Sequence, residues 1–260
     1  MKLTIACIQM DLAFGDPKKN FQSAENLIQE AAAKKPDIIL LPELWTTGYD
    51  LTRINEIADE NANETTVFLQ NAARKHGIHF VGGSVANKTS EGVFNTLLIV
   101  DKHGNKIHEY SKLHLFKLMD EHLYLSRGKS KGLFQLENRK FAGVICYDIR
   151  FPEWIRTHTS KGAEALFVVA EWPHSRLSHW RSLLIARAIE NQCFVIACNR
   201  SGQDPNNTFA GHSMFIDPWG EIIAEAGEQE EILVAEIDLS ETGKVRKMIP
   251  IFEDRMPDFY

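Results

Sequence analysis

The stretch FAGVICYDIRFPEW, residues 141–154, changes from apolar to polar at Cys146. An apolar run typical of a buried strand ends on this cysteine, and the segment from Tyr147 to Glu153 is rich in polar and charged residues. Ligand sites in α/β sheets gather at the carboxyl ends of strands, where a turn can also aim backbone N–H groups at an oxyanion. We therefore predict that Cys146, as the last residue of its strand, is a nucleophile beside a cleft. The alternative is a core thiol, because free cysteine is among the most buried residue types.

The other three cysteines are not followed by a comparable polar segment. Cys7, Cys193 and Cys198 lie within apolar stretches that we predict as strands, so we assign them to the core. The four cysteines form no C-x-x-C pair and are too sparse for a disulfide framework. A reducing cytoplasm is therefore the expected location.

The pattern of apolar residues predicts an α/β fold. Helices first alternate with strands, and hairpins also appear, including a turn at residues 217–220. No linker or low-complexity segment divides the chain, so we expect a single domain over residues 1–260. Strands are expected at 3–10, 37–41, 79–85, 95–101, 107–111, 140–146, 164–170, 193–199, 212–217 and 231–238. Helices are expected at 18–35, 64–77, 152–161 and 176–192.

The overall composition argues against two classes of partner. The chain has 260 residues, 44% of them hydrophobic, and a formal net charge of -6. No stripe of lysine and arginine stands out, so a nucleic-acid partner is not expected. No uncharged apolar run is long enough to cross a bilayer, so no membrane partner is expected either.

Two further residues stand at the ends of predicted strands with apolar neighbours. Glu43 follows an apolar strand within PDIILLPELWTTGY, and Lys112 follows another within IHEYSKLHLF. Glu43 is a candidate general base for a thiol, and Lys112 is a candidate cation for a carbonyl oxygen that becomes negatively charged. The alternatives are a loop glutamate in water and a solvated lysine, since both residue types are mostly exposed.

Taken together, the stretches LLPELWTTGY, YSKLHLF and GVICYDIRFPEW resemble the three motif blocks of the nitrilase, or carbon–nitrogen hydrolase, superfamily. The similarity also covers IACIQMD, ARAIENQCFVIACNR and GHSMFIDPWGEIIAEA, and therefore nearly the whole chain. The resemblance implies a four-layer α-β-β-α sandwich that pairs into a homodimer. It also implies that the catalytic glutamate, lysine and cysteine fall on Glu43, Lys112 and Cys146. A second glutamate of the family falls on Glu121.

These roles imply hydrolysis of an amide through a cysteine thioester, for which no metal or organic cofactor is needed. The backbone N–H of Tyr147 is expected to help Lys112 hold the oxyanion. Glu121 is expected to orient Lys112 or to hold the substrate nitrogen.

Three other kinds of function are compatible with parts of the sequence. A papain-like enzyme needs a histidine base, for which His114 in the lysine block is the candidate. A metal site drawn from His108, His114, Asp120 and His122 matches no common ligand spacing. A small-molecule binding protein without catalysis would tolerate the loss of Cys146.

The residues after Cys146, together with the segment AEWPHSRLSHWRSLLIARAIENQ, resemble Nit-type amidases and bacterial omega-amidases. That resemblance implies a small amide with a distal carboxylate, such as 2-oxoglutaramate or 2-oxosuccinamate. Arg150 is the candidate for binding this carboxylate, with Arg176 second. An ion pair between Arg150 and Asp148 or Glu153 is the alternative. The expected pocket walls, each of which could equally be core, are Tyr49, Phe116 and Trp172. Other amides of the superfamily, including deaminated peptides, N-carbamoyl compounds and nitriles, remain alternative substrates.

Overall fold

The computed structural model describes residues 1–259, which form two mixed sheets. The first sheet has the strand order β13-β1-β2-β4-β5-β6, and β3 pairs with β4 beside this path. Its strands are β1 (Lys2–Gln9), β2 (Ile38–Leu40), β3 (Asp59–Glu60), β4 (His79–Thr89), β5 (Gly92–Val100), β6 (Lys106–Ser111) and β13 (Glu231–Asp238).

The second sheet has the order β12-β11-β10-β9-β8-β7. Its centre is parallel, because β8 pairs with β9 and β9 with β10 in the same direction. The carboxyl ends of these three strands therefore lie side by side at one edge of the sheet. The strands are β7 (Leu133–Leu136), β8 (Arg139–Ile145), β9 (Ala165–Ala170), β10 (Phe194–Asn199), β11 (Met214–Ile216) and β12 (Ile222–Glu225).

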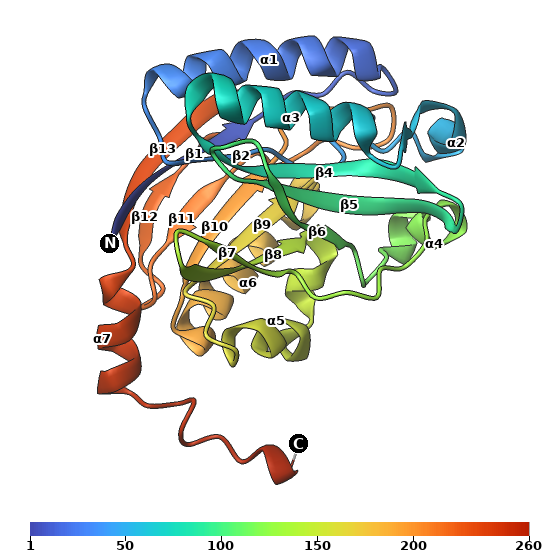
Figure 1. The fold of residues 1–260 in the computed structure, drawn as a ribbon. Helices are drawn as coiled ribbons and strands as arrows, with labels where there is room; N and C mark the ends of the chain where they lie inside the picture. Colours follow the sequence, from blue (N-terminus) through green and yellow to red (C-terminus); the bar gives the residue numbers. More distant parts are fainter. Residues whose placement is uncertain (260) are drawn as a thin grey trace.

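Helices cover the outer faces of the two sheets, so the layers run α-β-β-α as expected (Figure 1). α1 and α3 lie over the first sheet, and α5 and α6 lie against the second. The α-helices are α1 (Pro17–Ala33), α2 (Ile54–Ile57), α3 (Asn63–His76), α4 (Glu121–Tyr124), α5 (Pro152–Thr159), α6 (Leu177–Asn191) and α7 (Ser240–Met248). Within residues 1–259, no helix combines the length and the apolar character that a bilayer crossing requires.

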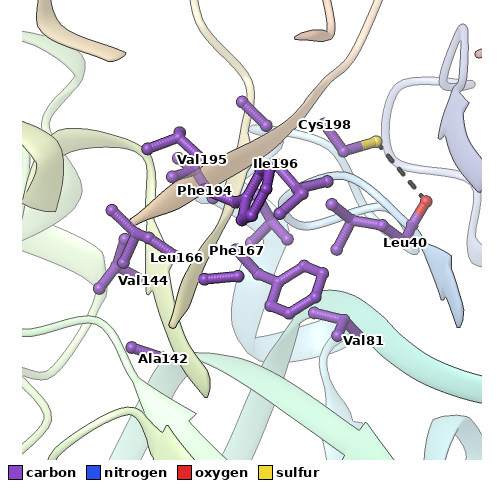
Figure 2. Close-up of a cluster of buried hydrophobic side chains, with 14 of the residues drawn as sticks. Leu40, Val81, Ala142, Val144, Leu166, Phe167, Phe194, Val195, Ile196 and Cys198 are labelled. Atoms are coloured by element: carbon purple, nitrogen blue, oxygen red, sulfur yellow. Dashed lines mark hydrogen bonds between the residues drawn. The ribbon is translucent and has the colours of Figure 1, made fainter. Parts of the chain in front are cut away.

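The main hydrophobic core fills the space between the two sheets. Figure 2 shows Phe167 of β9 between the sheets, near Leu40 of β2 and Val81 of β4. β2 and β9 are apolar along their whole length because one face meets the other sheet and the other face meets helices. A second cluster, which includes Ala24, Ile28 and Leu69, fills the layer under α1 and α3.

Three sequence signals for element ends are confirmed. α3 ends before Gly77, whose φ of +69° places it in the left-handed region that glycine tolerates best. α5 begins at Pro152, at the first helical position that proline favours. A turn at residues 217–220 joins β11 to β12. Each of these element ends is determined by neighbouring residues in the sequence, so tertiary contacts do not change it.

Two of the strand boundaries that differ from the prediction involve cysteines. β8 ends at Ile145, so Cys146 begins the following 3₁₀ turn instead of ending the strand. β10 starts at Phe194, so Cys193 precedes the strand but is still fully buried. Cys7 and Cys198 are buried in β1 and β10, as predicted.

Candidate active site

Cys146 lies at the point where β8 turns into the 3₁₀ segment Cys146–Arg150. Its φ is +45°, a left-handed conformation that is uncommon for a residue with a side chain. Such a conformation costs on the order of 1–3 kcal/mol and persists only where neighbouring contacts enforce it. One such contact is the backbone N–H of Ile145, which donates to Asp148 Oδ2 over 3.0 Å. The sharp turn takes the chain out of the strand at Cys146.

Glu43 is fully buried three residues past β2. Its Oε1 accepts from Lys112 Nζ at 2.8 Å and from Asn95 Nδ2 at 2.7 Å. Its Oε2 accepts from the backbone N–H of Glu171 at 2.9 Å. Because Glu171 follows β9 of the second sheet, this last bond joins the two sheets at the site. The alternative of a loop glutamate in water is therefore wrong.

Lys112 follows β6 and is fully buried as well, so it is not a solvated lysine. Besides Glu43, its ammonium contacts Glu121 Oε1 at 2.6 Å. The other carboxyl oxygen of Glu121 accepts from the backbone N–H of Phe116 at 2.9 Å. The hydroxyl of Tyr49 lies 2.9 Å from Glu43 Oε1 and 2.6 Å from Glu121 Oε1. Two carboxylates thus share one ammonium in a site without water-exposed side chains.

Burial and the neighbouring charges shift the pKa values of Lys112 and Glu121 in opposite directions. Burial lowers the pKa of Lys112, but the neighbouring Glu121 and Glu43 carboxylates outweigh it and hold that pKa well above its usual value. Burial raises the pKa of Glu121, while Lys112 opposes the rise. The lysine therefore stays an ammonium ion, as a group that stabilises a developing oxyanion must.

The thiol of Cys146 is held in its protonated form. Burial raises its pKa well above the usual range, Glu43 raises it further as a nearby charge and hydrogen-bond acceptor, and Lys112 opposes the rise. A thiol in this setting becomes a nucleophile only if a base takes its proton as it attacks. The Glu43 carboxylate, whose negative charge already acts on the thiol, is the candidate for this base.

Asp148 ties the turn of Cys146 to the segment that follows Lys112. Its carboxylate accepts from Tyr110 OH at 2.7 Å and from the backbone N–H of His114 at 3.2 Å. The Nδ1 of His114 lies 2.7 Å from the same carboxylate, and its ring stacks on Phe151 with centroids 3.7 Å apart. His114 is thus engaged with Asp148 and Phe151 and does not line the cavity beside Cys146.

A small cavity opens beside Cys146. Four of the predicted substrate-binding residues, Phe116, Arg150, Trp172 and Arg176, line it together with Cys146 and Tyr147. The remaining predicted wall, Tyr49, does not line this cavity, because its side chain belongs to the carboxylate cluster. Met119, Glu171 and Pro173 complete the lining.

Among residues 1–259, no carboxylate forms an ion pair with either arginine of the cavity. The expected alternative pairing of Arg150 with Asp148 or Glu153 does not form among the described residues. The guanidinium of Arg150 instead lies 4.8 Å from the centre of the Trp172 ring, and its Nη2 is 3.3 Å from His179 Nδ1. Arg176 lies over Phe116 at 5.6 Å. The cavity therefore holds two half-buried positive charges beside the thiol.

The sequence analysis did not identify Asn95 and Glu171 as residues of this site. It also did not predict that Asp148 ties the turn of Cys146 to the segment after Lys112. Glu171 could have been predicted from the sequence, because it follows the apolar strand β9 much as Glu43 follows β2. Asn95 lies within β5, and no local pattern distinguishes it from other polar strand residues. The residues considered for a metal site are dispersed, and residues 1–259 hold no His/Cys/Asp/Glu cluster suited to a metal ion.

Comparisons with known proteins agree with this geometry. Residues 4–247 match the family described as carbon-nitrogen hydrolase. A 2-oxoglutaramate amidase of Bacillus subtilis is 56% identical over the full length of both chains. The omega-amidase YafV of Escherichia coli is 33% identical, covering 97% of this chain and 96% of its own.

Solved structures share the whole fold. A CN-hydrolase superfamily protein of Xanthomonas campestris, with an arsenic adduct in its active site, superposes with a TM-score of 0.93 at 32% identity and covers 98% of both chains. Nit3 of Saccharomyces cerevisiae, a member of the nitrilase superfamily, gives a TM-score of 0.89 at 30% identity over 96% of this chain and 94% of its own. On sequence and structure together, this chain belongs to the carbon-nitrogen hydrolase family.

Proposed function

We propose that this enzyme hydrolyses the terminal amide of a small 2-oxo dicarboxylic acid, with 2-oxoglutaramate as the leading substrate. The observation that carries the proposal is the shared cavity: the Cys146 thiol, with its proposed base Glu43, lies beside two arginines that have no carboxylate partner among residues 1–259. The relatives named 2-oxoglutaramate amidase and omega-amidase support the same substrate class.

The first half of the reaction forms a thioester. Glu43 takes the proton from the Cys146 thiol while sulfur attacks the amide carbon, and the carbonyl electron pair moves onto oxygen. The Lys112 ammonium and the backbone N–H of Tyr147 hold this oxyanion; one such donor is worth about 3–4 kcal/mol of barrier. When the C–N bond breaks, the nitrogen takes the proton from Glu43 and leaves as ammonia.

The second half regenerates the thiol. Glu43, again a carboxylate, takes a proton from water, and the water oxygen attacks the thioester carbon. The same oxyanion donors hold the second tetrahedral intermediate. The C–S bond then breaks, sulfur recovers its proton from Glu43, and the product leaves as a carboxylic acid that gives its remaining proton to bulk water. Glu121 keeps the lysine oriented throughout, through its 2.6 Å contact with the ammonium.

The charges around the cavity favour an anionic substrate. Arg150 is held by ring stacking on Trp172, which leaves its planar donor edge available for a carboxylate. Other amides of the family, such as deaminated peptides, N-carbamoyl compounds and nitriles, are the competing candidates. An ammonia-release screen over 2-oxoglutaramate, 2-oxosuccinamate, glutamine, carbamoyl amino acids and simple nitriles ranks them directly.

Replacement of the proposed catalytic residues should abolish turnover without unfolding the protein. We expect Cys146→Ala to lose essentially all amidase activity, because no other group supplies the nucleophile. Glu43→Gln and Lys112→Met should each lower kcat by about two or more orders of magnitude, as for loss of a general base or an oxyanion donor. Steady-state ammonia release, with circular dichroism as a check on folding, measures both effects.

A matched control is Cys193→Ala. This thiol is fully buried but outside the cavity, so its loss should lower thermal stability through a packing defect and leave kcat of the folded enzyme unchanged. A Cys146→Ala enzyme with activity near wild type would refute the nucleophile. A Glu43 or Lys112 variant that keeps more than about a tenth of wild-type kcat would refute that residue's role.

Loss of Arg150 should penalise substrates that carry a carboxylate. A charge-assisted hydrogen bond is worth about 1.5–3 kcal/mol, so Arg150→Met should lower kcat/KM for 2-oxoglutaramate by roughly 10- to 100-fold. Butyramide, which has no carboxylate, should be far less affected. Equal losses on the two amides would mean that Arg150 has only a structural role, and Arg176→Met would then be the next variant to compare.

We further propose that the enzyme is a homodimer that pairs through the face of α5 and α6. Ile189 of α6 is 51% exposed and Ile249 is 47% exposed, and both line a surface groove beside the C-terminal segment. Sedimentation velocity should give twice the mass of one chain, and Ile189→Glu should shift the enzyme toward monomer. Val67→Glu, at an equally exposed site on α3, should not. A monomeric wild type would contradict the proposal.

We also propose that the enzyme works in the cytoplasm. All four cysteines are free and buried, which suits a reducing compartment. Cell fractionation that recovers the enzyme outside the cytoplasm would refute this location.

A further inference from the structure

Glu171 is a buried acidic residue beside the nucleophile that the mechanism does not use. It follows β9 directly, is 1% exposed and lines the cavity that contains Cys146 and Arg150. Its Oε2 accepts from Arg200 Nη1 at 2.7 Å, but its buried Oε1 has no hydrogen-bond partner within the described part of the chain. An unpartnered buried polar atom costs about 1–3 kcal/mol, and such an atom in a substrate cavity suggests a contact with the substrate.

The partner of Glu171 is held in place by several other groups. Arg200 follows β10 as Glu171 follows the adjacent parallel strand β9. Its guanidinium also donates to the carbonyl oxygens of Ser201 and Leu12, and it lies 4.0 Å over the Phe209 ring. A second carboxylate, that of Asp11, lies 4.0 Å from its Nη2. Arg200 therefore fixes one oxygen of Glu171 and shares its charge among several acceptors.

The surroundings of Glu171 favour its neutral form. Burial raises the pKa of this carboxyl to about 8, although Arg200 opposes the rise and Glu43 and Asp204 add to it. An anionic substrate in the cavity would disfavour a second negative charge there still further. With Oε2 turned to Arg200, the proton of the neutral carboxyl falls on Oε1.

We propose that Glu171 is a specificity-determining residue whose protonated Oε1 donates a hydrogen bond to the 2-oxo oxygen of the substrate. This inference rests on the proposed function and extends it, because it assigns the recognition of the 2-oxo group to one side chain. The enzyme should then prefer 2-oxoglutaramate to glutaramate, which has a methylene group in place of the 2-oxo group.

The distribution of donors in the cavity supports this assignment. In the proposed mechanism, Lys112 and the Tyr147 N–H donate to the amide oxygen of the substrate, and an arginine binds its carboxylate. The 2-oxo oxygen is then the one substrate acceptor that still lacks a hydrogen-bond donor. Glu171 lies between the group that faces the amide and the group that faces the carboxylate. Its backbone N–H donates a hydrogen bond to Glu43, and the ring of the next residue, Trp172, packs against the guanidinium of Arg150. A neutral carboxyl suits a ketone there, since it adds no charge that would repel the nearby carboxylate.

Two substitutions of Glu171 test whether its side chain donates a hydrogen bond to the substrate or has only a structural role. Glu171→Gln keeps the shape and places an N–H donor in the cavity, so the ratio of kcat/KM for 2-oxoglutaramate to that for glutaramate should stay within about threefold of wild type. Glu171→Leu removes the donor and should lower the same ratio about tenfold or more. A partly misfolded sample loses both activities alike, so the ratio is insensitive to it. If Glu171→Leu does not fold because Arg200 is left unpaired, Glu171→Leu with Arg200→Met replaces it.

The outcomes decide the proposal in either direction. An unchanged ratio in the leucine variant would mean that Glu171 is only structural, and an equal fall in both variants would mean that the negative charge matters instead of a donated proton. Either result overturns the inference.

If the wild type hydrolyses another amide, the proposed function fails, and competitive inhibition of that reaction by 2-oxoglutarate and glutarate then provides the test. Tighter inhibition by 2-oxoglutarate that Glu171→Leu abolishes supports the inference, and equal inhibition of the wild type overturns it.

Discussion

One ammonium between two carboxylates, all without solvent exposure, is the interaction on which the site depends. Lys112 lies 2.8 Å from Glu43 and 2.6 Å from Glu121, and the three side chains are fully buried. Removing such charges from water carries a desolvation penalty of several kcal/mol per ion, which only close contacts and additional hydrogen bonds can offset. The amide of Asn95 and the backbone N–H groups of Phe116 and Glu171 supply those bonds. A merely stable core would not need this arrangement, whereas acid–base chemistry carried out by buried side chains does.

The sandwich brings these groups together because both sheets present strand ends at the same edge. Glu43 and Lys112 come from the first sheet, and Cys146 and Glu171 come from the parallel centre of the second. The sheets are joined at this edge by the bond from the Glu171 N–H to Glu43 and by a bridge between Asp11 and Ser201. The apolar layer in Figure 2 fixes the distance between the sheets, and with it the distance between the proposed base Glu43 and the proposed nucleophile Cys146. Core packing and catalytic geometry are thus set by the same contacts.

The sequence predicted the parts of this site that leave a local signal. A charged or reactive residue directly after an apolar run distinguishes Glu43, Lys112 and Cys146, and the family resemblance brings them together with Glu121. The same signal at Glu171 went unused because a single acidic residue after a strand is ambiguous until its neighbours are known. Its pairing with Arg200 depends on β9 and β10 being adjacent and parallel, a relation between distant segments. The left-handed turn at Cys146 was also missed, because Asp148 enforces it through Tyr110 and His114, which lie more than thirty positions away in the chain.

The account makes one chemical commitment that can be observed directly, namely a covalent acyl group on Cys146 during turnover. The enzyme can be mixed with 2-oxoglutaramate, quenched in acid within the first turnovers and digested, and the peptides weighed by mass spectrometry. The expected result is the mass of the acyl group on the peptide that contains Cys146, at a level that falls as substrate is consumed. Ammonia release without any adduct in samples quenched during turnover, or an adduct on a different residue, would contradict the account.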